Sequence, residues 1–186
     1  MIKDPSASTL LITGGAGFVG SSFALHWKAR HPGSTVIALD NLKRRGSELN
    51  LPRLKNAGIQ FVHGDVRDAA DLRTLPRIDA LVECSAEPSV LAGYSGGADY
   101  VVNTNLVGTI NCLELVARDK ADLVFLSTSR VYPIAAINDM CTRNERGFLI
   151  DPNTRVPGAS SKGIGEDFPL TGVRTLYGAT KLASEL

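Results

Sequence analysis

The chain has 186 residues, of which 44% are hydrophobic and 21% charged, and its formal net charge is only +1. A nearly neutral chain lacks the basic surface that nucleic-acid-binding proteins present to phosphates. It contains no run of about 20 apolar residues, and its first residues lack the apolar core of a signal peptide. The composition argues against a disordered chain and predicts a soluble, cytoplasmic protein that binds neither nucleic acid nor a membrane.

The cysteines give no sign of a disulfide framework or a metal site. Cys84, Cys112 and Cys141 are odd in number and lack the spacing of metal ligands, and His26, His31 and His63 lack it too. We therefore expect buried, reduced thiols and no bound metal.

Short apolar runs alternate with amphipathic stretches, a pattern typical of repeated βα units around a parallel sheet. It predicts strands at residues 9–13, 35–40, 59–63, 79–84 and 122–127, and helices at 18–30 and 47–57. The expected fold class is α/β, a Rossmann-like doubly wound parallel sheet with flanking helices.

Two further segments complete the chain. Before the fifth strand, Val102, Leu106, Ile110, Leu113 and Ala117 recur at three- and four-residue steps, which predicts a long helix that buries this face. Residues 133–176 carry many prolines and glycines with little periodicity, and we expect a long loop with little regular structure. Helical pattern resumes at about residue 177 and continues to residue 186.

A glycine-rich turn joins the first strand to the first helix. Gly14, Gly17 and Gly20 allow a tight turn, a close approach of backbone to a pyrophosphate, and close packing of helix on strand. The phosphates would sit at the positive end of the helix dipole. The alternative is a glycine-rich turn without a ligand. Asp40 ends the second strand, where a carboxylate accepts hydrogen bonds from a ribose 2′-hydroxyl and repels a 2′-phosphate, so NAD is favoured over NADP.

Two neighbouring segments leave alternatives open. Lys43, Arg44 and Arg45 follow the second strand and are either a solvated basic loop or a site for the phosphate of NADP. Asp65 and Val66 follow the third strand, where an adenine ring lies in such folds, although Asp65 can equally be a turn residue.

Tyr177 and Lys181 are four residues apart and share one face of the last helix. A lysine ammonium and a nicotinamide cation would stabilise the phenolate and make the tyrosine a general base for a sugar hydroxyl. An ordinary surface pair is the alternative. Thr128 follows the fifth strand at the edge where parallel sheets bind ligands, and its hydroxyl can orient the reacting oxygen.

Taken together, the segments TGGAGFVG, LDNL, GDVRD, NTNLVGT, FLSTSRVY and YGATK resemble the extended short-chain dehydrogenase/reductase family of NAD-dependent epimerases and dehydratases. The resemblance implies an enzyme that binds NAD and a nucleotide sugar. It assigns catalysis to Thr128, Tyr177 and Lys181. It assigns cofactor binding to Gly14, Gly17, Phe18, Val19, Gly20, Asp40, Asn41, Asp65, Val66, Cys84, Ser85, Ala86, Asn105, Tyr177 and Lys181, although Asn105 can equally be a helix-packing residue.

Within the family, residues 40–54, 83–94, 126–134 and 163–185 are similar to enzymes that epimerise a CDP-linked hexose at C2. The resemblance implies conversion of CDP-paratose to CDP-tyvelose through a transient 2-keto sugar. A UDP-hexose 4-epimerase and a non-catalytic NAD-binding module are the alternatives. The family's 4,6-dehydratases carry an Asp-Glu pair after the threonine, where this chain has Ser129 and Arg130, so dehydration is not expected. Arg130 and Glu87 either face the sugar nucleotide or form structural ion pairs.

The family's proteins continue beyond the last helix with further strands and a smaller substrate domain. We therefore expect one domain, residues 1–186, that is truncated within its last helix and lacks the nucleotide-sugar lid. Poor activity of this piece alone, marginal stability and exposed apolar surface are expected to follow from this. A homodimer formed through a helix pair, including the helix that begins at Tyr177, is a further expectation.

Overall fold

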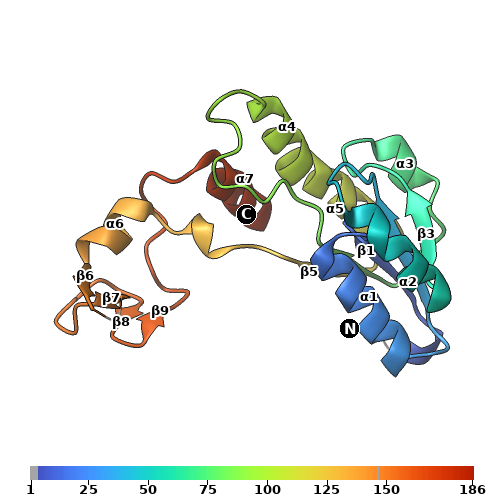
Figure 1. Cartoon of the computed structure of the whole chain (residues 1–186), viewed down its shortest axis with the longest axis horizontal. Helices are drawn as coiled ribbons and strands as arrows, with labels where there is room; N and C mark the ends of the chain where they lie inside the picture. Colours follow the sequence, from blue (N-terminus) through green and yellow to red (C-terminus); the bar gives the residue numbers. More distant parts are fainter. Residues whose placement is uncertain (1–3, 146) are drawn as a thin grey trace.

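The computed structural model describes residues 4–145 and 147–186. Five parallel strands form one sheet in the order β3-β2-β1-β4-β5 (Figure 1). Their bounds are β1 Thr9–Thr13, β2 Thr35–Asp40, β3 Gln60–His63, β4 Ala80–Glu83 and β5 Asp122–Phe125. All five lie within the predicted strands, and the α/β fold class is confirmed. The order reverses at β1, which lies between β2 and β4, and parallel sheets bind ligands beyond the strand ends at such a point.

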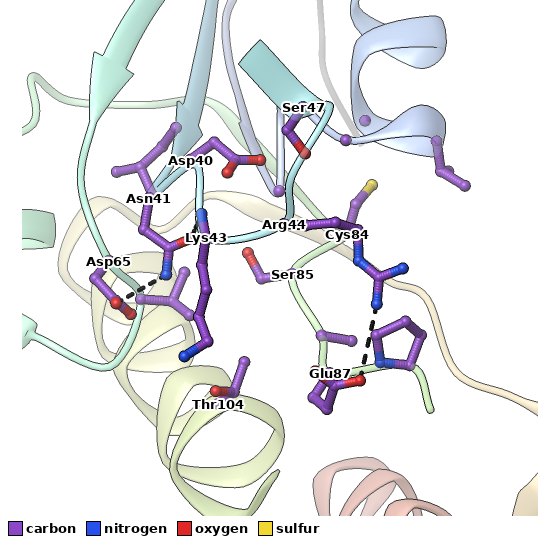
Figure 2. A pocket seen from close by; sticks show the side chains of 18 of the residues that line it. Asp40, Asn41, Lys43, Arg44, Ser47, Asp65, Cys84, Ser85, Glu87 and Thr104 are labelled. Atoms are coloured by element: carbon purple, nitrogen blue, oxygen red, sulfur yellow. Dashed lines mark hydrogen bonds and ion pairs between the residues drawn. The ribbon is translucent and has the colours of Figure 1, made fainter. Parts of the chain in front are cut away.

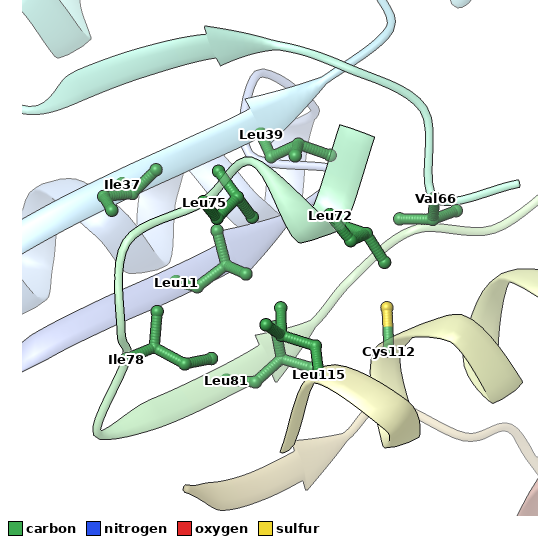
Figure 3. Close-up of a cluster of buried hydrophobic side chains, with 10 residues drawn as sticks. All are labelled: Leu11, Ile37, Leu39, Val66, Leu72, Leu75, Ile78, Leu81, Cys112 and Leu115. Atoms are coloured by element: carbon green, nitrogen blue, oxygen red, sulfur yellow. The ribbon is translucent and has the colours of Figure 1, made fainter. Parts of the chain in front are cut away.

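Both faces of the sheet carry helices, because β1, β2 and β4 are apolar at most positions. Leu11, Ile37, Leu39 and Leu81 project to one face, where they pack against α3 (Ala69–Arg73) and α5 (Gly108–Asp119) (Figure 3). The alternate residues Leu10, Ile12, Val36, Ala38 and Val82 project to the other face, against α1 (Phe18–Arg30) and α2 (Leu51–Asn56). These two clusters are the core that holds the strand ends in place.

Two predicted helices differ in detail, and one helix was not predicted. Residues 47–57 form a 3-10 turn, η2 (Ser47–Asn50), followed by the shorter α2. Helix α3 was not predicted; it has five residues and is capped by Asp68, whose Oδ1 accepts a 2.8 Å hydrogen bond from Ala70 N. The long helix is α4 (Ala98–Val102), a π-helical turn η3 (Asn103–Val107) and α5 in sequence.

The predicted buried face of the long helix is wrong. Ile110 and Leu113 are 47% and 42% exposed, whereas Thr109, Cys112 and Leu115 are buried against the sheet. The wider π-helical turn lies between Val102 and the α5 residues, so positions before and after it are not related by the 3.6-residue period that the prediction assumes.

The segment between β5 and the last helix is more regular than predicted. It contains η4 (Ser129–Val131), α6 (Ile134–Asp139), a hairpin of β6 (Cys141–Asn144) and β7 (Gly147–Ile150), and a small hairpin of β8 (Ala159–Ser160) and β9 (Gly163–Ile164). This segment extends away from the sheet, and the chain then returns to α7 (Leu176–Glu185) beside α4 (Figure 1). Across the described residues no helix has the length and hydropathy of a membrane span, and no metal-binding cluster of His, Cys, Asp or Glu occurs.

Candidate functional site

The turn between β1 and α1 is shaped so that backbone approaches backbone. Gly14 has φ +62°, and a Cβ there would lie 2.8 Å from the Cys84 carbonyl oxygen. Gly17 N donates to Gly14 O at 3.0 Å, and a Cβ on Gly20 would overlap the same oxygen. Gly17 is also the N-cap of α1 and makes no side-chain cap, so the N–H groups of the first turn remain available to a phosphate. The turn therefore fits a pyrophosphate.

A cavity of about 430 Å³ opens at this turn and runs along the carboxyl ends of the strands (Figure 2). Its walls include every cofactor residue predicted before Asn105: Gly14, Gly17, Phe18, Val19, Gly20, Asp40, Asn41, Asp65, Val66, Cys84, Ser85 and Ala86. Ser47, Gly64, Tyr100 and Thr104 also line it and were not predicted. Gly64 directly precedes Asp65, and Thr104 lies within the NTNLVGT segment, but nothing local in the sequence marks Tyr100. Tyr100 and Thr104 reach the cavity because α4 and η3 pack there.

Carboxylates are held at one end of the cavity by their neighbours. Asp40 accepts hydrogen bonds from Ala16 N at 3.1 Å and Leu42 N at 2.8 Å, which fixes its carboxylate beside the glycine turn. Asp65 accepts from Asn41 Nδ2 at 2.9 Å and forms a 2.6 Å ion pair with Arg67. Burial raises the pKa of Asp65, but the hydrogen bonds from Arg67 and Asn41 outweigh it and lower the pKa to about 2. Both side chains are placed to accept from hydroxyl or amine groups.

The basic residues after β2 contact other side chains of the protein. Lys43 Nζ lies 4.1 Å from the centre of the Tyr100 ring, and Arg44 forms a 3.8 Å ion pair with Glu87. Both cations line the cavity, whereas Arg45 is exposed and is not part of the lining. Glu87 thus forms an ion pair with Arg44 and also lines the cavity, so both of its alternatives stay open.

Tyr177 and Lys181 lie on α7 and are only 8% and 2% exposed. This excludes the alternative of an ordinary surface pair. Helix α7 packs against η4, whose N-cap is Thr128, and a Cβ on Gly178 would overlap the Arg130 carbonyl oxygen. Thr128 Oγ1 accepts from Arg130 N at 3.2 Å. The three predicted catalytic residues therefore come from two elements in direct contact.

Asn105 joins three parts of the structure. Its Oδ1 accepts from Glu87 N at 2.7 Å, and its Nδ2 donates to Glu87 O at 3.1 Å and to Thr180 Oγ1 at 3.3 Å. The loop after β4 is thereby tied to η3 and α7. Asn105 is 1% exposed and, like Tyr177 and Lys181, is absent from the cavity lining that the described residues form. These contacts are those of the helix-packing alternative.

A buried acid near Lys181 was missed by the sequence analysis. Glu83, the last residue of β4, is fully buried and accepts a 2.8 Å hydrogen bond from Thr109 Oγ1. Burial lowers the pKa of Lys181, and the negative field of Glu83 opposes this change. Burial and Glu83 together raise the pKa of Cys84 to about 11, so this thiol stays protonated at neutral pH. A single acid at the end of an apolar strand gives no periodic signal.

Comparisons with known proteins agree with this geometry. The chain is 35% identical over 131 residues to a dTDP-glucose 4,6-dehydratase of Mycobacterium tuberculosis, covering 70% of this chain and 39% of that protein. It is 35% identical over 130 residues to a CDP-paratose 2-epimerase of Salmonella typhi, covering 66% of this chain and 37% of that protein.

Among solved structures, the dTDP-glucose 4,6-dehydratase DesIV of Streptomyces venezuelae, with NAD and TYD bound, superposes with a TM-score of 0.70 at 32% identity. The alignment covers 95% of this chain and 49% of DesIV. The chain thus spans half or less of the length of these relatives.

The family model described as the NAD dependent epimerase/dehydratase family matches residues 10–186. The match takes in the glycine turn, the cavity and the Tyr177–Lys181 helix, and it confirms the predicted family of enzymes and its cofactor, NAD. The chain belongs to the NAD dependent epimerase/dehydratase family.

Proposed function

We propose that this chain carries the NAD site and the proton-transfer residues of a nucleotide-sugar epimerase, and that the sugar is CDP-paratose, converted at C2 to CDP-tyvelose. The observation that carries the proposal is the burial of Tyr177 and Lys181 against η4, beside a cavity lined by the glycine turn and Asp40. A base of this kind acts on a sugar hydroxyl only where water is excluded and its orientation is fixed.

Each residue has one task. Gly14, Gly17 and Gly20 bind the pyrophosphate, and Asp40 accepts hydrogen bonds from the ribose. NAD, when bound, supplies the hydride acceptor and donor. Tyr177 takes the proton of the sugar hydroxyl and returns it, while the Lys181 ammonium stabilises the phenolate and Thr128 orients the oxygen.

Two features favour epimerisation over dehydration, although relatives of both kinds are 35% identical to this chain. Loss of water needs an acid and a base next to the threonine, and Ser129 and Arg130 occupy those positions. The segments at residues 40–54 and 163–185 resemble those of CDP-sugar 2-epimerases. The deciding experiment incubates a full-length version of the protein with CDP-paratose and, separately, with a UDP-hexose, and follows the sugars by NMR. CDP-tyvelose is the expected product, and turnover of the UDP-hexose alone would assign the protein to the 4-epimerases.

The variant Tyr177→Phe tests the role of the hydroxyl. It removes the proton acceptor but keeps the ring, so we expect NAD binding to be unchanged and turnover to fall by about two to four orders of magnitude. Tyr94→Phe, at an exposed tyrosine, is the matched control and should retain full activity. Equal turnover in Tyr177→Phe and the control contradicts the mechanism. NAD binding without turnover of either sugar in the unmodified full-length protein would instead support the non-catalytic NAD-binding module.

We also propose that two copies of the chain associate through the outer face of α5. Leu106, Ile110, Leu113 and Ala117 follow one another at three- and four-residue steps, and the last three are exposed. An apolar stripe on a helix that already buries its opposite side favours pairing with a second helix.

A further inference from the structure

The buried acid at the end of β4 has an unusual environment. Glu83 Oε1 accepts from Thr109 Oγ1, whereas Oε2 is buried and, among residues 4–145 and 147–186, has no hydrogen-bonding partner. A carboxyl group without exposed surface and with one donor requires either a bound proton or a nearby cation. Cys84, the next residue, lines the cavity, so the proton or the cation that neutralises Glu83 lies close to the cofactor site.

Lys181 places a cation over the same face of the sheet. Glu83 pairs with Phe125 in the register of β4 and β5, and Lys181 Nζ lies 4.2 Å from the centre of the Phe125 ring. Side chains at paired positions of neighbouring parallel strands project to the same face. The ammonium and the carboxyl therefore share one buried space between the sheet and α7.

The hydrogen bonds around Thr109 favour the ionised carboxylate. Thr109 Oγ1 has a single proton and lies 2.8 Å from Glu83 Oε1 and 2.9 Å from Asn105 O. Ser184 Oγ on α7 lies 3.0 Å from the same Asn105 oxygen and can donate to it. Ser184 Oγ also lies 3.0 Å from Thr180 O, so its one proton has two acceptors in reach. When Ser184 donates to Asn105 O, Thr109 can give its proton to Glu83, and the second carboxylate oxygen is left to face a cation.

We propose that Glu83 is the buried counter-charge of Lys181, a positioning residue that keeps the ammonium protonated and held on α7 for its work beside Tyr177. The role of Glu83 in catalysis rests on the proposed function, but the pairing of its charge with Lys181 does not. Removal of the negative charge leaves a buried ammonium without compensation, which makes its proton easier to lose.

The surrounding titratable groups are few. Lys181 is faced by Glu83 and Cys84 from β4 and its loop, and by Tyr177 and Glu185 from its own helix. Glu83 is faced in addition by Cys112 from α5. The π-helical turn carries no titratable side chain. Asp99 of α4, which also packs against α7, and Arg130 of η4 are exposed, and Tyr100 of α4 lines the cavity. Burial raises the pKa of Glu83, and Thr109 and Lys181 oppose this change.

The test is an NMR titration of this chain without substrate. Lysine side chains are labelled with 13C and 15N, and the Lys181 signal is assigned by its loss in Lys181→Arg. In Glu83→Gln, which keeps the shape and removes the charge, we expect the pKa of Lys181 to fall by about one unit or more. Glu185→Gln is the matched control because Glu185 also acts on Lys181 but is solvent-exposed, and its effect should be much smaller.

Two results would overturn the proposal. One is an unchanged Lys181 titration in a Glu83→Gln variant whose thermal unfolding shows a folded protein. The other needs no variant at all: a 13Cδ shift showing that Glu83 in the unmodified chain is protonated at pH 7. Because neither measurement involves a sugar, a failed epimerase assay with a normal titration would refute only the proposed function.

Discussion

Single side chains at the cavity hold charges that the fold itself stabilises, and Asp65 shows this most clearly. Its carboxylate receives an amide donor from Asn41 and an ion pair from Arg67, and its side chain is only 21% exposed. A pKa of about 2, against 3.8 for a free side chain, means that the folded state prefers the ionised form. The resulting stabilisation is fully present above pH 4 and is lost as the pH falls towards 2.

Asp65→Asn is expected to remove this dependence of the stability on pH. The variant should lower the free energy of unfolding by about 1–2 kcal/mol at pH 7, because the charge that Arg67 and Asn41 stabilise is gone. It should also flatten the decline in stability between pH 4 and pH 2. Urea unfolding at several pH values measures both effects. Asp167→Asn, at an exposed aspartate, serves as the control, and an acid transition equally steep in Asp65→Asn would contradict the assignment.

Among the elements, α7 carries Tyr177 and Lys181 and packs against η4, and one glycine allows this close contact. Gly178 faces the Arg130 carbonyl of η4 at a distance that admits no side chain, and Thr175 caps the helix by accepting from Gly178 N at 3.1 Å. The position of Tyr177 relative to Thr128 therefore depends on a residue without a Cβ.

Gly178→Ala should move α7 away from η4. Overpacking of this kind costs about 1–3 kcal/mol, and we expect a loss of that size in the free energy of unfolding. Turnover should fall at least tenfold because small displacements of catalytic groups are costly, while NAD binding at the remote glycine turn is retained. Ala183→Gly changes an exposed position of the same helix and is the control. Unaltered turnover in Gly178→Ala would show that this contact does not position Tyr177.

Elements whose environment is set by the sheet were predictable from the sequence, and those set by distant packing were not. The apolar runs of β1 and β2 and the turn at Gly14 are local signals, so the strands and the glycine turn were predictable from the residues. The cavity residues Phe18, Val19, Asn41, Cys84, Ser85 and Ala86 were assigned by the resemblance to the family. Tyr100 and Thr104 reach the cavity only through the packing of α4 and η3. Glu83 was missed because its partner Thr109 is 26 residues away and belongs to another element.

At the scale of the whole molecule, α5 carries an exposed apolar surface at residues that were predicted to be buried. The part of the predicted stripe that lies on α5 (Ile110, Leu113 and Ala117) is exposed, since Thr109, Cys112 and Leu115 occupy the sheet side of α5. We propose that this exposed apolar face contacts a second copy of the chain. A helix with two apolar faces, one of them left exposed among the described residues, is typical of a subunit interface.

Ile110→Glu tests that interface. A charge at the middle of the stripe would have to be buried between the two copies, which is costly for an unpaired carboxylate, so we expect the dimer to dissociate into monomers. Sedimentation velocity over a range of concentrations measures the change. Leu49→Glu is the matched control, because Leu49 is 75% exposed but lies on η2 rather than on α5. The interface is assigned wrongly if the unmodified chain is a monomer at all concentrations, or if Ile110→Glu and Leu49→Glu dissociate alike.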